Sequence, residues 1–200
     1  MQRSTQRILT THTGSLPRPQ EVADIAYGHD QREADANPDF ARMVTAAVAG
    51  VVRRQREVGI DVVNDGEQSK VSYATYMTDR LTGFDGPPQT RAPQPESEMF
   101  PEFYASLQPV GARFRVSTCD GPITWRGDEQ VQRDIANLRA ATAGAGATDV
   151  FMSSASPGVV AAFLPNTYYP SHEAYVFAIA DAMRHEYQAI AAAGFVLQLD

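Results

Sequence analysis

The stretch that decides the fold is Gly59-Ile60-Asp61-Val62-Val63-Asn64-Asp65-Gly66-Glu67-Gln68. A helical pattern ends at Gly59, an apolar strand follows over residues 60–63, and acidic and amide side chains come directly after it. Such groups are poor core material, whereas the carboxyl ends of parallel strands are where α/β proteins build their binding sites. Taken alone, the stretch is interpreted equally well as an exposed Asp-Gly turn. The other strand ends decide between the two interpretations.

Strand-turn-helix units repeat along the chain, which predicts a parallel sheet with right-handed crossovers. Strands are expected over residues 8–15, 60–63, 114–119, 149–154 and 195–199, and helices over residues 37–59, 71–81, 128–143 and 171–193. No unit carries Gly-x-Gly-x-x-Gly, so a dinucleotide-binding fold would lack its phosphate loop. Polar residues at the strand ends favour a (β/α)8 barrel, in which all sites collect on one face.

Five strands are too few for such a barrel, which needs eight strands and about 250 residues. We therefore expect residues 1–200 to form the amino-terminal part of one barrel domain, with the remaining strands in a longer chain or in a partner. An open barrel would expose strand edges, so self-association or a partner chain that completes it is expected. The Pro-, Gln- and Glu-rich segment at about residues 85–110 is predicted to be an insertion that lies over the surface or forms a lid.

The composition argues against several classes of partner. The chain has 17 Lys and Arg residues against 24 Asp and Glu residues, a formal net charge of −7, and no basic stripe. Nucleic acid and anionic membrane surfaces are therefore not expected as partners. No apolar run is long enough to cross a bilayer, and the first residues lack the apolar core of a signal peptide. Cys119 is the only cysteine, which suits the reducing cytoplasm, where we expect the protein.

Three strand ends carry matching chemistry: His12-Thr13-Gly14-Ser15, Asp65-Gly66-Glu67 and Gln198-Leu199-Asp200. In a barrel they would meet at one mouth and bring a hydroxyl and backbone amides beside two or three carboxylates. That set suits a zwitterionic amino acid, with the amides and hydroxyl binding its carboxylate and the acidic side chains binding its ammonium group. It could equally support acid-base catalysis between carboxylates. His12 is a candidate ligand or proton carrier, and equally a structural histidine.

Four motifs of this chain occur in the same order in a known family. They are residues 10–19, Gly59 to Lys70, Gly121 to Thr124, and Glu186 through Asp200. They resemble the catalytic domain of cobalamin-independent methionine synthase, and more closely the short, single-barrel relatives of that enzyme. The resemblance implies a TIM barrel of the methionine-synthase type in which zinc activates a thiol for alkyl transfer. It also implies an S-methyltransferase of methionine biosynthesis that methylates homocysteine, with a methyl-tetrahydrofolate as the candidate donor.

The resemblance assigns roles to individual residues. Thr13, Gly14 and Ser15 match the turn that holds the homocysteine carboxylate. Glu67 matches the acidic residue that contacts the amino group of homocysteine, and Asp200 matches a second carboxylate that binds the same group. The zinc ligands of the family are a His-x-Cys pair, a Glu and a further Cys on later strands. They are therefore expected beyond residue 200, and no metal ligand or bond-making residue is predicted within this chain.

Two alternatives remain open. A thiol alkyltransferase of the epoxyalkane:coenzyme M type uses the same scaffold with an acceptor that bears a sulfonate. The presence of both Glu67 and Asp200 favours an acceptor with an ammonium group instead. The second alternative is a non-catalytic fragment, either a truncated barrel or one part of a split barrel that needs another chain.

Overall fold

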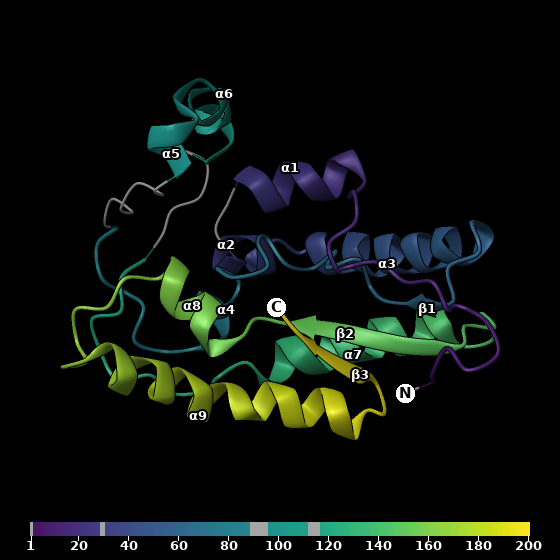
Figure 1. The fold of residues 1–200 in the computed structure, drawn as a ribbon. Coiled ribbons are helices and arrows are strands. Elements are labelled where there is room, and N and C mark those ends of the chain that lie inside the picture. Colours follow the sequence, from purple (N-terminus) through teal and green to yellow (C-terminus); the bar gives the residue numbers. More distant parts are fainter. Residues whose placement is uncertain (1, 29–30, 89–95, 112–116) are drawn as a thin grey trace.

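The computed structural model describes residues 2–28, 31–88, 96–111 and 117–200. At its centre is a parallel sheet with the strand order β1-β2-β3 (Figure 1). The strands are β1 (Val62–Val63), β2 (Asp149–Ser154) and β3 (Val196–Leu199). In the register of β2 and β3, Ser153 lies opposite Gln198. The expected α/β class with a parallel sheet is confirmed.

Helices surround this sheet. Those of the described ranges are α1 (Gln20–Gly28), α2 (Gln31–Ala36), α3 (Phe40–Glu57), α4 (Met77–Arg80), α5 (Glu96–Met99), α6 (Pro101–Gly111), α7 (Asp128–Thr142), α8 (Pro157–Phe163) and α9 (His172–Ala192). α7 packs between α3 and α9, while α3 contacts β1 and α9 contacts β2 and β3 (Figure 1). Among these helices, none is long and apolar enough to cross a membrane.

The two faces of β2 have different neighbours, because successive side chains of a strand point to opposite sides. Met152 belongs to the hydrophobic core shared with α3 and α7, and Ser154 donates a hydrogen bond to a carboxylate of α9. Phe151 and Ser153 point the other way and contact residues 12 and 67. The sheet therefore has a helix-covered face and a second face on which the amino-terminal segment and the loop after β1 lie.

The long helices agree with the sequence prediction. α3 buries one apolar face, and Gly59, with φ of 85°, follows its end. The helix begins at Phe40 and not at Asn37, because the Asn37 side chain accepts a hydrogen bond from the backbone amide of Asp39 and shapes the preceding turn. Ser171 caps α9 as predicted, and its hydroxyl accepts a hydrogen bond of 3.1 Å from the first turn.

The predicted strand over residues 8–15 is wrong. This segment lies beside β1, where the Thr10 carbonyl accepts hydrogen bonds from the amides of Asp61 and Val62 at 3.1 and 3.0 Å. The amide of Thr10 donates to the Asp61 carboxylate at 2.9 Å, and the Thr11 hydroxyl donates to the Val62 carbonyl at 3.0 Å. The side chains of Asp61 and Thr11 thus form hydrogen bonds that backbone groups would form in a regular strand pair.

The predicted helix over residues 71–81 is also wrong for most of its length, since α4 provides only its last turn. The hydroxyl of Ser72 accepts hydrogen bonds from the amides of Ala74 and Thr75, at 3.3 and 3.4 Å. Serine side chains that bond to nearby amides compete with helix formation, which explains the series of turns before α4.

Of the five expected strands, three are found within the described ranges. The strand expected over residues 114–119 falls partly on residues 112–116, which lie outside the described residues. Beyond them, Thr118 and Cys119 form isolated bridges to Gly86 and Asn166. The bridge to Asn166 is parallel, and the bridge to Gly86 is antiparallel.

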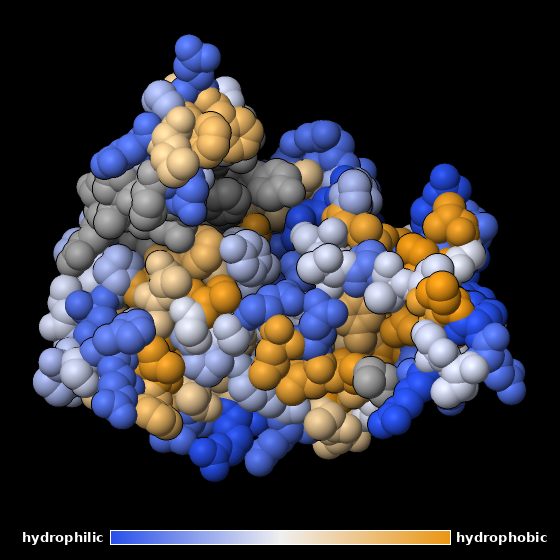
Figure 2. Space-filling view, viewed as in Figure 1, coloured by the Kyte–Doolittle hydropathy of each residue, from blue (hydrophilic) through white to orange (hydrophobic). Residues whose placement is uncertain are grey.

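The segment expected to be an insertion or lid contains α5 and α6, while residues 89–95 within it lie outside the described residues. Met99, Phe100 and Phe103 of this segment are exposed, and Figure 2 shows the apolar surface that gathers over the two helices at the top of the view. That this segment forms a lid over a site remains a prediction.

A buried ionic network ties three elements together behind the sheet. Arg80 forms salt bridges with Asp134 of α7 and with Glu186 of α9, the second at 2.9 Å, and all three side chains are buried. Burial alone would lower the pKa of Arg80, but Glu186 and Asp134 outweigh it and raise that pKa. Burial raises the pKa of Tyr76 well above its usual value, so its phenol stays protonated and donates to Glu186 at 2.6 Å.

Replacing Arg80 should therefore destabilise the fold strongly. In Arg80→Met the two carboxylates of α7 and α9 lose their shared cation, and breaking a buried ion pair from one side costs about 3–5 kcal/mol. Urea unfolding monitored by circular dichroism measures the loss. Arg42→Met is the control, because Arg42 pairs with Asp39 on the surface, where such a pair contributes about 0–1 kcal/mol. Equal losses in both variants would contradict this assignment.

Candidate functional site

The Glu67 side chain lies against the second face of the sheet. Its side chain is 2% exposed, and its Oε1 accepts a hydrogen bond of 2.6 Å from the hydroxyl of Ser153 on β2. Its backbone φ is 55°, in the left-handed region, which is uncommon for a residue other than glycine. Backbone strain of this kind tends to occur at functional sites, where surrounding bonds hold it. Here the Glu67 amide donates to the Asp65 carboxylate at 2.9 Å.

The loop that carries Glu67 is pinned to α3 by one side chain. Gln55 of α3 donates to the Asn64 carbonyl at 2.8 Å and accepts from the Asn64 amide at 3.0 Å. From the other side, Arg18 donates to the carbonyls of Glu67 and Lys70 at 2.6 and 2.5 Å. The polar residues that follow β1 therefore form a buried, hydrogen-bonded loop, and the exposed-turn interpretation is wrong.

The predicted turn over residues 12–15 lies directly on Glu67. A Cβ atom added at Gly14 would lie 2.6 Å from Glu67 Oε1, so any larger residue would have to displace the carboxylate. The amide of Leu16 donates to the Gly66 carbonyl at 3.0 Å, which joins the turn to the loop. Ser15 is exposed on the same turn, beside the buried Gly14.

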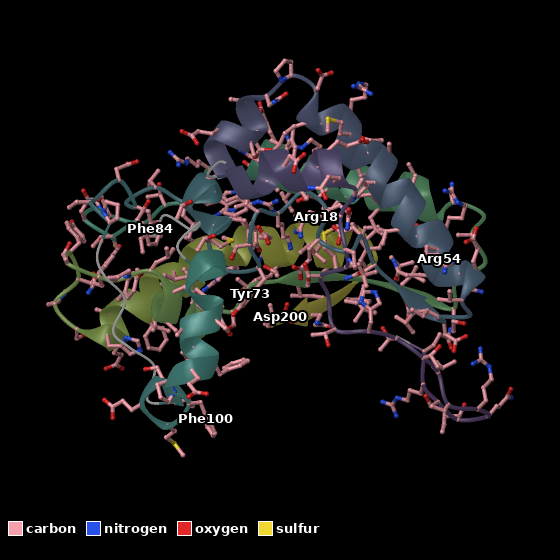
Figure 3. The ribbon with its side chains drawn as sticks, turned by 90° about the horizontal axis from the view of Figure 1, so that it is seen from above. Arg18, Arg54, Tyr73, Phe84, Phe100 and Asp200 are labelled. Atoms are coloured by element: carbon pink, nitrogen blue, oxygen red, sulfur yellow. The ribbon has the colours of Figure 1, made fainter. Side chains whose placement is uncertain are left out.

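Asp200 is connected to the same turn through Gln198. The amide nitrogen Nε2 of Gln198 donates to the Thr13 carbonyl at 2.5 Å and to Asp200 Oδ1 at 2.8 Å. The backbone of Asp200 bonds to Ser154 and Ser156, at 3.1 and 2.8 Å, beyond the end of β3. Three predicted strand ends therefore come together at one edge of the sheet, where Figure 3 labels Asp200.

His12 lies behind the turn. Its Nε2 is 2.9 Å from Gln55 Oε1 of α3, and its ring packs edge-on against Phe151 with 5.7 Å between the ring centroids. Its Nδ1 is buried and has no hydrogen-bond partner among the described residues. Across those same residues, no group of three His, Cys, Asp or Glu side chains is placed to hold a metal ion. The residues that the structure describes therefore do not fit a zinc site.

Sequence reasoning missed two residues of this site, Ser153 and Lys70. The Nζ of Lys70 donates to the Ser153 carbonyl at 2.6 Å and lies 4.5 Å from the centre of the Tyr76 ring. Alternation along the predicted strand over residues 149–154 could have placed Ser153 on the face opposite Met152. Burial raises the pKa of Asp65, and the charge of Lys70 opposes that rise.

The parallel sheet and its covering helices define an α/β protein, and buried carboxylates lie at the carboxyl ends of its strands, the edge at which proteins of this class build their binding sites. Over 75 residues the chain is 35% identical to methionine synthase of Sulfolobus acidocaldarius, which covers 38% of this chain and 22% of the relative. It is 32% identical over 75 residues to 5-methyltetrahydropteroyltriglutamate–homocysteine methyltransferase of Acidithiobacillus ferrooxidans. This match covers 38% of this chain and 9% of the relative. No family model matches the chain.

Two solved structures share the fold. One is a B12-independent methionine synthase from Shewanella sp. W3-18-1 in complex with selenomethionine, with a TM-score of 0.71 and 21% identity over 96% of this chain. The other is a Listeria monocytogenes protein assigned as a vitamin-B12 independent methionine synthase, with a TM-score of 0.63 and 19% identity over 98% of this chain. This chain spans 50% and 53% of their lengths. The resemblance to cobalamin-independent methionine synthase is confirmed.

Gly14→Ala should destabilise the protein by about 1–3 kcal/mol, the usual cost of overpacking a buried contact. The added methyl group would have to displace the Glu67 carboxylate from its bond with Ser153. Gly50→Ala is the matched control, because Gly50 lies within α3 with nothing within 4 Å of an added Cβ. The control should gain about 0.5–1 kcal/mol in urea unfolding. A neutral Gly14→Ala would show that the turn can move away from Glu67.

The hydrogen bonds between Asp61 and the amino-terminal segment predict that the stability of the protein depends on pH. The hydrogen bond from Arg7, with those from Thr10, holds the pKa of Asp61 well below its usual value. A carboxyl group whose pKa falls on folding stabilises the protein above its unfolded pKa of about 3.9 and loses this effect as the pH falls further. Asp61→Asn should therefore lower the Tm at pH 7, and the difference from wild type should narrow steadily below about pH 4. A constant difference would contradict the role of the ionised carboxylate.

Proposed function

We propose that this chain supplies the amino-acid-binding part of a methyltransferase that transfers a methyl group to the thiol of homocysteine and so forms methionine. The observation that carries the proposal is the contact between the turn at Gly14 and the buried carboxylate of Glu67. It brings acceptors for an ammonium group next to a turn whose amides suit a carboxylate. The names of the sequence relatives support the same activity.

In this proposal the chain binds and orients the acceptor. Glu67 and Asp200 accept hydrogen bonds from the ammonium group, while Thr13, Gly14 and Ser15 bind the carboxylate. Holding the ammonium group and the carboxylate, which are both bonded to Cα, would fix the direction of the side chain and its thiol, and orientation of this kind lowers the barrier to reaction. His12 contributes through its contacts with α3 and β2, which hold the back of the turn.

The name of one relative, 5-methyltetrahydropteroyltriglutamate–homocysteine methyltransferase, supports a folate as the methyl donor. We propose a reduced, methylated folate of this kind as the donor. The resemblance also implies a zinc ion, which would lower the pKa of the acceptor thiol. Since the described residues do not fit a zinc site, the proposal assigns no step to the metal.

We further propose that the sheet is part of a (β/α)8 barrel in a cytoplasmic protein. The parallel pairing of the strands and the helices that cover one face of the sheet are both features of such a barrel. In the described ranges β3 pairs with β2 alone, and Leu199 of β3 is 50% exposed. Further strands, from a longer chain, a second copy or a partner, would cover this edge.

Calorimetric titration tests the proposal directly. The protein is titrated with L-homocysteine and with coenzyme M, a thiol that carries a sulfonate and no amino group. Binding of homocysteine alone would support the amino-acid site. Preference for coenzyme M would favour the epoxyalkane-type alkyltransferase, and binding of neither thiol would favour a non-catalytic fragment.

Glu67→Gln tests the residue at the centre of the site. Removing the charge should weaken homocysteine binding by about 1.5–3 kcal/mol, the range for hydrogen bonds to charged groups. Glu57→Gln is a matched control, because Glu57 is exposed near the end of α3 and pairs with Arg53 and Arg54. Calorimetry on both variants measures the effect, and unchanged affinity in Glu67→Gln would remove Glu67 from the binding site.

A further inference from the structure

We propose that Ser153 is a positioning residue that makes the site selective for ligands with an ammonium group. The inference rests on the proposed function and deepens it. No motif of the resemblance includes Ser153, and its place in the site follows from contacts made by both its side chain and its backbone. It lies on β2, is 1% exposed, and faces Gln198 across the β2–β3 pair.

Ser153 binds two oppositely charged side chains of the loop after β1, Glu67 and Lys70, through two different atoms. Its hydroxyl donates to Glu67 Oε1 at 2.6 Å, and its carbonyl accepts from Lys70 Nζ at 2.6 Å. Glu67 and Lys70 are both buried, at 2% and 3% exposure, and both reach the same residue. In the part of the chain that the structure describes, they make these bonds to Ser153 and no ion pair with each other.

This separation matters because a buried carboxylate and a buried ammonium group attract each other strongly at low dielectric. If they paired, Lys70 would occupy the position that a ligand ammonium group needs. Ser153 prevents this by fixing Oε1 against Gly14, where a Cβ would be 2.6 Å away. The second oxygen of Glu67 is then the one left for the ligand.

The neighbouring serine provides an internal comparison. Ser154 is also 1% exposed and also donates to a buried carboxylate, Glu186 Oε1 at 2.7 Å. Its bond lies on the helix-covered face of β2, within the Arg80 network. The two serines therefore match in burial and in bond type, and they differ in the face on which they act.

The test measures two ligands by calorimetry on wild type, Ser153→Ala and Ser154→Ala. L-Methionine carries the ammonium group, and 4-(methylthio)butanoate is the same molecule without it. Ser153→Ala should weaken methionine binding about 10-fold or more while changing the affinity for 4-(methylthio)butanoate less than about 2-fold. Ser154→Ala should lower the Tm but keep the preference for methionine. Ser153→Thr retains the hydroxyl and should restore the preference.

The possible results separate the inference from the function on which it rests. If wild type fails to prefer methionine, both are overturned. If wild type prefers methionine and Ser153→Ala keeps that preference, or if both alanine variants lose it equally, the inference alone is overturned. Should Ser153→Ala not fold, Ser153→Cys replaces it, since a thiol of similar size is a weaker donor and should lower the preference in the same direction.

Discussion

The buried guanidinium of Arg80 is the interaction on which the rest of the structure depends. It joins α7 to α9 through Asp134 and Glu186, and it comes from the last residue of α4. Glu186 also accepts a bond from Ser154, which fixes the carboxyl end of β2 against α9. Since a guanidinium with several fixed partners allows few geometries, this network holds α4, α7, α9 and the end of β2 in one arrangement.

Long elements with a clear hydrophobic period were predictable from sequence, and short polar ones were not. The apolar face of α3 and the serine cap of α9 needed only local information. The segment over residues 8–15 has the composition of a strand. However, the amide of Thr10 donates its hydrogen bond to the carboxylate of Asp61, which is distant in sequence. In the same way, bonds from Ser72 replace the expected helix before α4. In both cases a side chain competes with the backbone, which hydrophobic patterning does not detect.

The site was partly predictable for a related reason. Gly14, Glu67 and Asp200 end their segments with residue types that suit neither a core nor a regular strand, so they stand out in sequence. Ser153 and Lys70 do not, because a serine at a strand end and a lysine in a loop are ordinary surface residues. Only the coordinates bring them together, since their bond joins residues 83 positions apart.

The charges on the two faces of β2 bear on the proposed binding of an ammonium group. Lys70 lies over the Tyr76 ring, and its charge acts to lower the pKa of both Asp65 and Glu186. The charge of Lys70 is thus balanced by Asp65 of the loop and by Glu186 of the buried network, while its nitrogen is bonded to a carbonyl of β2. Glu67 and Asp200 are held by neutral donors, a serine hydroxyl and a glutamine amide. Neither donor brings a positive charge, so in the proposed function the ammonium group of the ligand would supply the cation that the immediate partners of Glu67 and Asp200 do not.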